Sequence, residues 1–422
     1  MTKNIKVWKK ANKLIPGGNN FLSKNPSRFR TKKWPIYFSK SKGCEVWDLN
    51  NKKYIDFSFM GVGTNILGYN NKKVDSIVIK NIKKGNMTTL NCAEEVQLAD
   101  ELIKSHKWAG KVKFARTGAE ANAIALRLAR AFNKKNKVLI CGYHGWHDWY
   151  LSAKLNKKNY MDTHLFPNLK VEGVPKILRG NAYSVKYNDI DTIKNIIHKD
   201  KDISAIVMEV MRDEKPKKNY LKSIRNICNK NNICLIFDEC TSGFRESYGG
   251  LHLNYKIYPD IAMFGKAIGN GYALTAIIGK NKIMNKAKNT FISSTFWSER
   301  IGFTAALATL KEMKRIKSWK IITKKGQFIK KSLMEIAKEN GLGIKFSGLD
   351  SLIKFHLIGL GNYDYNKFIT EKMLNNNFLA GQNIYVSTAH TKKIIQKYLT
   401  YMNRVFKDLA KLKKNNESFS NY

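Results

Sequence analysis

One lysine, Lys266, stands apart from the many others in this chain because it lies in an apolar, glycine-flanked run. The run reads PDIAMFGKAIGNG and ends at Gly271. Its apolar stretch Ile261–Phe264 predicts a buried strand, so Lys266 follows the C-terminal end of that strand. A lysine at such a place either extends its amine to the surface, which is the commoner case, or performs covalent and proton-transfer chemistry.

A turn of small residues follows another predicted strand, Val112–Ala115, and opens a helix. It reads RTGAEA from Arg116 to Ala121. Ligands of open α/β sheets bind beyond the C-terminal strand ends, and a helix N-terminus offers unpaired N–H groups to a phosphate. A capping box of Thr117 with Glu120 accounts for the same residues, and the two interpretations are compatible.

Further side chains follow other apolar runs. Asp238 ends the run ICLIFD, and a carboxylate there needs a partner: an arginine, backbone N–H groups, a metal or a protonated ligand nitrogen. Tyr143 stands beside a glycine after Lys137–Cys141 and can lie against a planar ligand, although a core aromatic is the alternative. Glu209 follows the apolar run that ends at Met208. No histidine pair with a carboxylate has metal-ligand spacing, so no metal site is predicted.

One ligand would use all of these groups. Pyridoxal 5′-phosphate (PLP) needs a phosphate site, an aromatic surface, a carboxylate for its ring nitrogen and a lysine for its aldehyde. Lys266 would form the covalent bond to the aldehyde, and Asp238 would keep the ring nitrogen protonated, which makes the ring an electron sink.

Helices and apolar strands alternate through the middle of the chain. Helices are predicted at Val74–Lys84, Ala93–Lys104, Ala119–Asn133, Asp191–Lys199 and Lys218–Asn231. Strands are predicted at Val112–Ala115, Lys137–Cys141, Ala205–Met208, Cys234–Phe237, Ile261–Phe264 and Ala276–Gly279. Such alternation indicates an α/β fold with a mostly parallel sheet covered on both faces.

The two ends of the chain have a different pattern. An amphipathic helix over residues 1–15 and short strands around an Asn50-Asn51 turn come first. After a long helix at Ile301–Ile316, helices and strands follow to Lys414. We therefore expect residues 74–316 to form a large domain, and residues 1–73 and 317–422 to form a small α+β domain built from both chain ends.

The composition is that of a globular protein. Of 422 residues, 43% are hydrophobic and 26% are charged. No apolar run approaches the roughly 18 residues of a membrane span, and the first residues lack a signal-peptide core, so a cytoplasmic protein without a membrane partner is expected. Six cysteines without a C-x-x-C pair predict reduced, mostly buried thiols.

The formal net charge of +44 raises the alternative of a basic nucleic-acid-binding protein. The lysines are dispersed along the whole length among Asn and Ile, and no Arg-rich block or aromatic-basic platform is present. A general bias of composition explains this pattern better, so no nucleic-acid partner is expected, only a modest attraction of anionic metabolites.

Four runs, FARTGAEANAIALRLARAF, CGYHGWHDWY, IFDECTSGFR and FGKAIGNG, resemble the class-III, fold-type-I PLP-dependent aminotransferases. Within these, the chain is most similar to glutamate-1-semialdehyde 2,1-aminomutase and its aminotransferase relatives, over nearly its whole length. The resemblance implies a homodimer with shared active sites. It also implies these site residues: Lys266 as covalent lysine and proton shuttle, Asp238 on the pyridine nitrogen, Gly118 and Ala119 on the phosphate, Tyr143 on the ring, Glu209 beside it, and Thr295 on the neighbouring subunit's phosphate.

The sequence departs from the aminomutase pattern in the segments that would bind the substrate. Arg28 lies in an altered segment, Gln382 stands where the aminomutase has glutamate, and His144 is a third candidate for substrate contact. The run FWSERIG is similar to a branch linked to surface-polysaccharide or sugar-acid synthesis. The expected function is amino-group transfer from an amino acid to an aldehyde or keto acceptor; the aminomutase reaction of tetrapyrrole synthesis is the alternative.

Overall fold

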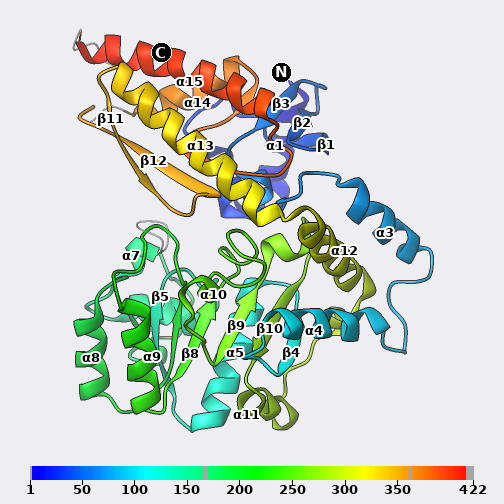
Figure 1. Cartoon of the computed structure of the whole chain (residues 1–422), viewed down its shortest axis with the longest axis vertical. Helices are drawn as coiled ribbons and strands as arrows, with labels where there is room; N and C mark the ends of the chain where they lie inside the picture. Colours follow the sequence, from blue (N-terminus) through cyan, green and yellow to red (C-terminus); the bar gives the residue numbers. More distant parts are fainter. Residues whose placement is uncertain (1, 165–169, 361–363, 415–422) are drawn as a thin grey trace. The chain divides into compact units, whose positions relative to one another are not determined.

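The computed structural model describes residues 2–164, 170–360 and 364–414, and Figure 1 labels their helices and strands. The chain divides into two compact units. Unit 1 combines Met1–Asp75 with Ile316–Tyr422, and unit 2 is the continuous stretch Ser76–Arg315. Among the described residues, none of the helices is both long and apolar enough to cross a membrane.

Unit 2 is built on a seven-stranded sheet in the order β4-β10-β9-β8-β7-β5-β6. Its strands are β4 (Lys111–Ala115), β5 (Lys137–Cys141), β6 (Ala182–Ser184), β7 (Ile203–Met208), β8 (Cys234–Asp238), β9 (Ile261–Phe264) and β10 (Thr275–Gly279). β10 pairs antiparallel with both β4 and β9, while the pairs from β9 to β6 are parallel. The C-terminal ends of β4, β5, β7, β8 and β9 therefore lie along one edge of the sheet.

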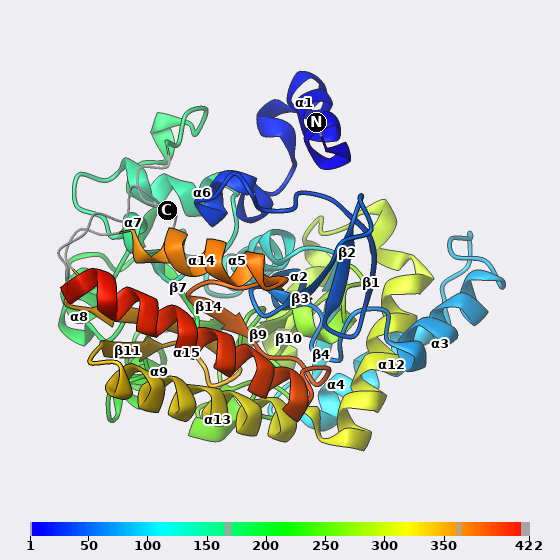
Figure 2. The same ribbon diagram turned by 90° about the horizontal axis from the view of Figure 1, so that it is seen from above.

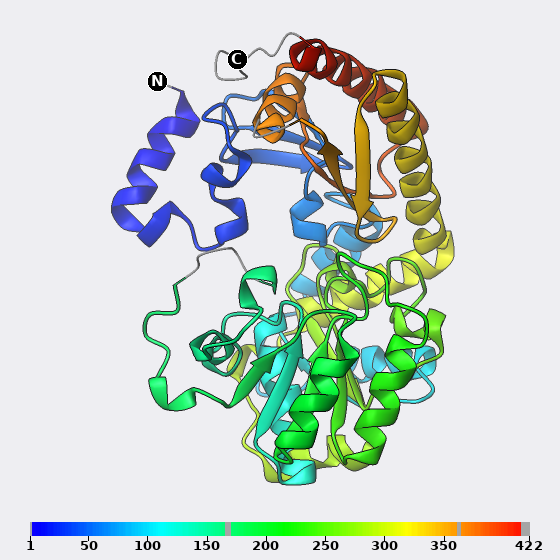
Figure 3. The ribbon, with the colours of Figure 1, turned by 90° about the vertical axis from the view of Figure 1, so that its left-hand side faces the viewer.

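Helices cover this sheet because its strands are apolar on both faces. α5 (Gly118–Asn133) packs across the sheet, and its buried side chains form one core with alternate strand residues such as Val207, Ile236 and Met263. The residues between them, such as Ile206 and Leu235, point to the opposite face and are also fully buried. α8 (Ile190–Lys199) and α9 (Tyr220–Lys230), green in Figure 3, lie side by side against the sheet.

The remaining helices of unit 2 are short or lie toward β4. They are α4 (Ala93–Ser105), α6 (Asp148–Leu151), α7 (Met161–His164), α10 (His252–Tyr255), α11 (Asn281–Met284) and α12 (Arg300–Ile316). α3 (Lys72–Ile82) precedes α4 in the chain. The helices and strands predicted for the middle of the chain are all present, within about two residues at their ends. The three-residue strand β6 was not predicted.

Unit 1 contains two small sheets. One has the order β1-β2-β3-β13 and the other β11-β12-β14. Their strands are β1 (Phe38–Lys42), β2 (Glu45–Asp48), β3 (Lys53–Asp56), β11 (Gly343–Ser347), β12 (Leu352–Ile358), β13 (Phe378–Leu379) and β14 (Asn383–Tyr385). β13 pairs in parallel with β3, so residues from the two ends of the chain share one sheet.

The helices of unit 1 are α1 (Lys3–Leu14), α2 (Met60–Gly63), α13 (Ser318–Glu339), α14 (Tyr365–Asn375) and α15 (Lys392–Lys414). α13 and α15 run side by side, as Figure 2 also shows. Each has an apolar face, and the residues of α15 on that face, among them Tyr398, Met402 and Phe406, are buried.

Candidate active site

Asp238 is the centre of a hydrogen-bonded cluster at the C-terminal end of β8. Its Oδ2 accepts hydrogen bonds from Asn122 Nδ2 at 2.7 Å and from His144 Nδ1 at 3.0 Å. Its Oδ1 accepts from the backbone N–H of Cys240 at 3.1 Å. Three donors from three segments thus fix the carboxyl group, as its burial requires.

These donors keep Asp238 ionised although it is buried. Burial alone would raise its pKa, but the hydrogen bonds from His144 and Asn122 outweigh this effect and hold the pKa at about 2. Asp238 is therefore a fixed negative charge at neutral pH. Because the carboxylate only accepts, the Nδ1 of His144 carries the proton of this contact.

Lys266 follows β9, the neighbouring strand, and begins the short 3₁₀ helix Lys266–Gly269. Its φ of 45° lies in the left-handed region, which a lysine seldom occupies. Its Nζ donates to Thr241 Oγ1 at 2.7 Å. Burial lowers the pKa of the amine. A strained backbone and a lowered pKa are typical of residues that take part in chemistry.

The N-terminus of α5 faces the same edge of the sheet. Thr117 and Glu120 form the expected capping box. The N–H groups of Gly118 and Ala119 lie in the first turn, where an α-helix supplies no acceptor, so they can bind an anion. Asn122 connects this turn to Asp238, because its amide also donates to Gly118 O at 2.9 Å.

Tyr143 and Glu209 lie at the ends of β5 and β7. The buried carboxylate of Glu209 accepts from Tyr143 N at 3.1 Å and from Arg212 Nη1 at 3.3 Å. Arg212 also lies over the Tyr143 ring, 5.7 Å from its centroid. This contact needs Gly142, whose φ is +119° and where a Cβ would come within 2.6 Å of Glu209 Oε2.

The segment that carries His144 approaches α5 closely. At Gly145 (φ +104°) a Cβ would stand 2.6 Å from the Cβ of Ala119, so only glycine fits. His144 itself is buried against Asp238. His144 is therefore a hydrogen-bond donor to the carboxylate, and the substrate contact expected of it stays a prediction.

The remaining predicted residues are Thr295, Arg28 and Gln382. Thr295 begins the 3₁₀ helix Thr295–Ser298 of unit 2 and is exposed. Arg28 and Gln382 belong to unit 1, where both line one pocket together with residues such as Ser58, Asn366 and Thr370. The buried Oε1 of Gln382 has no hydrogen-bond partner among the described residues.

Three residues of the cluster were not predicted as site residues from the sequence: Asn122, Thr241 and Arg212. Asn122 stands four residues after Gly118 on α5, so helical periodicity places it on the same face. Thr241 and Arg212 lie three residues after Asp238 and Glu209. Their positions after strand ends are a signal, but their contacts depend on how the loops fold.

The residues present fit PLP. An ionised buried carboxylate suits a protonated ring nitrogen, the first turn of α5 suits a phosphate, and an amine of lowered pKa suits an aldehyde. Unpartnered polar atoms also border Asp238, since Asn122 Oδ1 and His144 Nε2 are buried without a hydrogen bond among the described residues.

Comparisons with known proteins show the family of this chain. Residues 28–349 match the family model of class-III aminotransferases. The chain is 32% identical to a 3-aminobutyryl-CoA aminotransferase of Cloacimonas acidaminovorans, over 82% of each chain. It is also 32% identical to a glutamate-1-semialdehyde 2,1-aminomutase of Nitrosopumilus maritimus, over 94% of this chain and 97% of the relative.

Solved structures show the same fold. The FumI protein of Sphingopyxis sp. MTA144, solved in a form that carries PLP, superposes with a TM-score of 0.88 at 22% identity and covers 98% of this chain and 97% of its own. An omega-transaminase from Sphaerobacter thermophilus gives a TM-score of 0.86 at 19% identity, over 97% of this chain and 98% of its own. The fold is therefore that of the fold-type-I PLP-dependent transaminases, as predicted. The chain belongs to the class-III aminotransferase family, as a PLP-dependent enzyme of amino-group transfer.

Proposed function

We propose that this enzyme transfers an amino group between two separate molecules, from an amino-acid donor to an aldehyde or keto acceptor, in surface-polysaccharide or sugar-acid synthesis. The observation that carries the proposal is the pocket of unit 1 that both Arg28 and Gln382 line. A neutral amide replaces the glutamate expected of the aminomutase there. The run FWSERIG at 296–302 supports the same branch of the family.

Each residue of the cluster around Asp238 would have its own role in holding the cofactor. Gly118 and Ala119 would hold the phosphate through their N–H groups, and Tyr143 would lie against the ring with Glu209 fixing its backbone. Asp238 would hold the proton on the ring nitrogen, since its pKa of about 2 keeps it anionic. Asn122 and His144 would orient that carboxylate.

PLP bound at this site supplies an electron sink for the carbon that loses its proton. Lys266 would bind the cofactor aldehyde and then move the proton at its Nζ. Thr241 accepts a hydrogen bond from that Nζ at 2.7 Å and would orient the amine. In the whole reaction a C–N bond breaks in the donor and a C–N bond forms in the acceptor, so an amine and a carbonyl compound exchange places.

The aminomutase reaction is the second candidate, because a relative of that name matches this chain over 94% of its length. In it, the amino group returns to the same carbon skeleton. Such an enzyme would convert glutamate-1-semialdehyde to 5-aminolevulinate without a second substrate.

The two candidates are separated by substrate requirement. The PLP-loaded protein is incubated with glutamate-1-semialdehyde alone, and in parallel with amino donors in the presence and absence of carbonyl acceptors. The donor panel includes glutamate, alanine and 3-aminobutyryl-CoA, and sugar aldehydes and keto acids serve as acceptors. We expect turnover only when donor and acceptor are both present. Formation of 5-aminolevulinate from the semialdehyde alone at enzyme-like rates would instead establish the aminomutase.

We also propose a homodimer whose active sites are shared. Large apolar side chains are exposed along one segment of unit 2, with Ile79, Leu90 and Val96 at 55%, 82% and 72% exposure. Phe291, four residues before Thr295, is 88% exposed. Burial of such residues is a strong driving force for association. Thr295 would complete the phosphate site of the neighbouring subunit.

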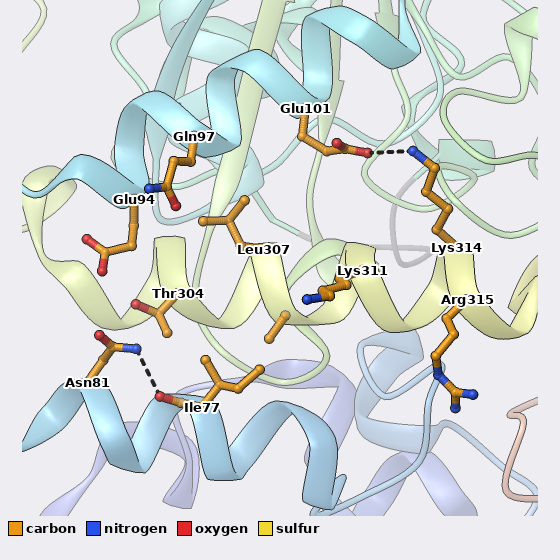
Figure 4. Close-up of a pocket in the computed structure, with 11 residues that line it drawn as sticks. Ile77, Asn81, Glu94, Gln97, Glu101, Thr304, Leu307, Lys311, Lys314 and Arg315 are labelled. Carbon is orange, nitrogen blue, oxygen red and sulfur yellow. Dashed lines mark hydrogen bonds and ion pairs between the residues drawn. The ribbon is translucent and has the colours of Figure 1, made fainter.

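A cavity of about 650 Å³ adjoins the same segment, between α3, α4 and α12 (Figure 4). Ile77 and Leu307 line it together with charged groups, including an ion pair of Lys314 with Glu101 at 3.6 Å. None of the residues around Asp238 lines it. Its position beside exposed Ile79 and Val96 supports an interface at this surface, distinct from the catalytic cluster.

A further inference from the structure

The side chain of Arg116 joins the phosphate-binding turn to the loop that carries Thr295. Arg116 is the residue between β4 and the cap of α5. Its guanidinium donates to the backbone oxygens of Phe296 at 2.6 Å, Ala273 at 3.2 Å and Glu299 at 3.0 Å. It also forms an ion pair with the Glu299 carboxylate at 2.9 Å. Only a planar, forked donor can make these contacts together.

Glu120 makes a second connection between the same two segments. One carboxylate oxygen accepts from the backbone N–H groups of Arg116 at 3.0 Å and Thr117 at 2.7 Å. The other accepts from the indole Nε1 of Trp297 at 3.1 Å. Glu120, the N3 residue of the α5 capping box, therefore also holds Trp297 of the loop that carries Thr295.

The surroundings are shaped for the Arg116 side chain. At Gly302 a Cβ would lie 2.3 Å from Arg116 Nη1, so a larger residue would displace the guanidinium. The Phe303 ring lies against the guanidinium, 5.5 Å away. The Glu299 carboxylate also accepts from Ile301 N and Gly302 N, both at 2.8 Å, and so caps α12.

We propose that Arg116 and Glu120 are positioning residues that fix the Phe296–Glu299 loop on the N-terminus of α5, and so set the affinity of the site for the cofactor phosphate. This inference rests on the proposed function, in which the turn at Gly118 and the hydroxyl of Thr295 bind phosphates. We refer to the contacts of Arg116 and Glu120 with Phe296, Trp297 and Glu299 as the clasp.

The clasp gives a role to two residues of the run FWSERIG. Trp297 and Glu299 stand within this run, and each contributes a side chain to the clasp. The ion pair of Arg116 with Glu299 is well shielded, with 12% and 14% of the two side chains exposed. In the proposed dimer, one clasp would link the phosphate turn of its own subunit to the threonine that serves the neighbouring subunit.

Cofactor binding tests the clasp directly. Variants Trp297→Phe and Arg116→Lys remove the indole donor and the forked guanidinium while keeping an aromatic ring and a positive charge. Cofactor-depleted protein is titrated with PLP and, separately, with pyridoxal, which lacks the phosphate. We expect each variant to bind PLP about tenfold more weakly, as for lost hydrogen bonds to charged groups, with pyridoxal affinity changed less than twofold.

A matched control is Arg225→Lys, which alters an ion pair of similar exposure, 14% and 9%, between Arg225 and Asp260 at the opposite strand ends. It is expected to leave PLP affinity unchanged. Unchanged PLP affinity in both clasp variants, or an equal loss for PLP and pyridoxal, would overturn the proposal while leaving the proposed function intact. A wild-type protein that binds PLP no better than pyridoxal would overturn the phosphate site itself.

Discussion

Two side chains at neighbouring strand ends, the buried Asp238 and the half-buried Lys266, are opposite in character. The carboxylate is surrounded by three donors and stays charged. The amine has one hydroxyl partner and a lowered pKa. Such a divergence allows one group to hold a proton on a ligand while the other accepts and returns one.

Lys266→Ala is expected to lose amino-transfer activity by at least about a hundredfold, because the proposed proton-transfer group is removed. Borohydride treatment should no longer attach PLP covalently to the chain, as mass spectrometry would detect. Lys280→Ala is the control, since Lys280 pairs with Asp260 at 2.8 Å at the far edge of the sheet. Retained activity in Lys266→Ala would refute the role given to this lysine.

Asp238→Asn keeps the size of the side chain and removes its charge. We expect kcat to fall by roughly a hundredfold or more, because the preorganised charge that we propose for the ring nitrogen is lost. The visible spectrum of bound PLP should change as the ring nitrogen loses its proton. A variant with nearly wild-type kcat and an unchanged spectrum would contradict the assignment.

The residues predicted from the sequence for their chemistry do lie at or just after strand ends, because apolar runs define those ends clearly. Asn122 and Thr241 escaped notice because amide and hydroxyl groups are common on helices and in loops. Asn122 contacts Asp238, and Thr241 contacts Lys266, both at 2.7 Å. Such contacts cannot be predicted from the spacing of residues along the chain.

At the scale of elements, a buried histidine makes the stability of unit 1 depend on pH. His390 donates from Nε2 to Asp56 O at 2.8 Å and accepts at Nδ1 from Ser387 N at 3.0 Å, so it is neutral in the fold. Burial lowers its pKa to about 4. The unfolded chain, with an ordinary histidine pKa of about 6.5, binds the proton first as the pH falls.

The stabilisation is therefore present above about pH 6.5 and is lost as the pH falls toward 4. We expect His390 to contribute roughly 2 kcal/mol to the loss of unfolding free energy between pH 7.5 and 5. Urea titrations of the wild type and His390→Gln at both pH values measure this term. The variant should be less stable at pH 7.5 but should lose less on acidification; parallel losses would contradict the prediction.

Long elements were predictable and very short ones were not. Uninterrupted apolar runs predict the strands of the central sheet, and a 3.6-residue period of apolar residues predicts the helices. β6, β13 and β14 have three, two and three residues, too few for any periodicity. The antiparallel placement of β10 between β4 and β9 was not predicted either, because strand order is decided by connections and packing.

At the scale of the molecule, association should depend on the exposed apolar segment. Leu90→Lys places a charge on a side chain that is 82% exposed. We expect this variant to shift toward monomers in size-exclusion chromatography with light scattering, and to lose activity because Thr295 would no longer reach a neighbouring site. Ile177→Lys, at an isolated position that is 87% exposed, is the control. If the Leu90→Lys protein is dimeric and active, the interface must lie at another surface.

The strand pair of β3 with β13 has a consequence for the order in which the protein is made. Ile55 lies opposite Phe378, more than three hundred residues later in the chain. During synthesis the ribosome therefore releases all of unit 2 before β3 can find this neighbour. Unit 2, which is continuous, can fold while translation proceeds. Until β13 has been synthesised, the edge of β3 that pairs with it stays unpaired. Nascent chains truncated before β13 should therefore be the ones that chaperones retain.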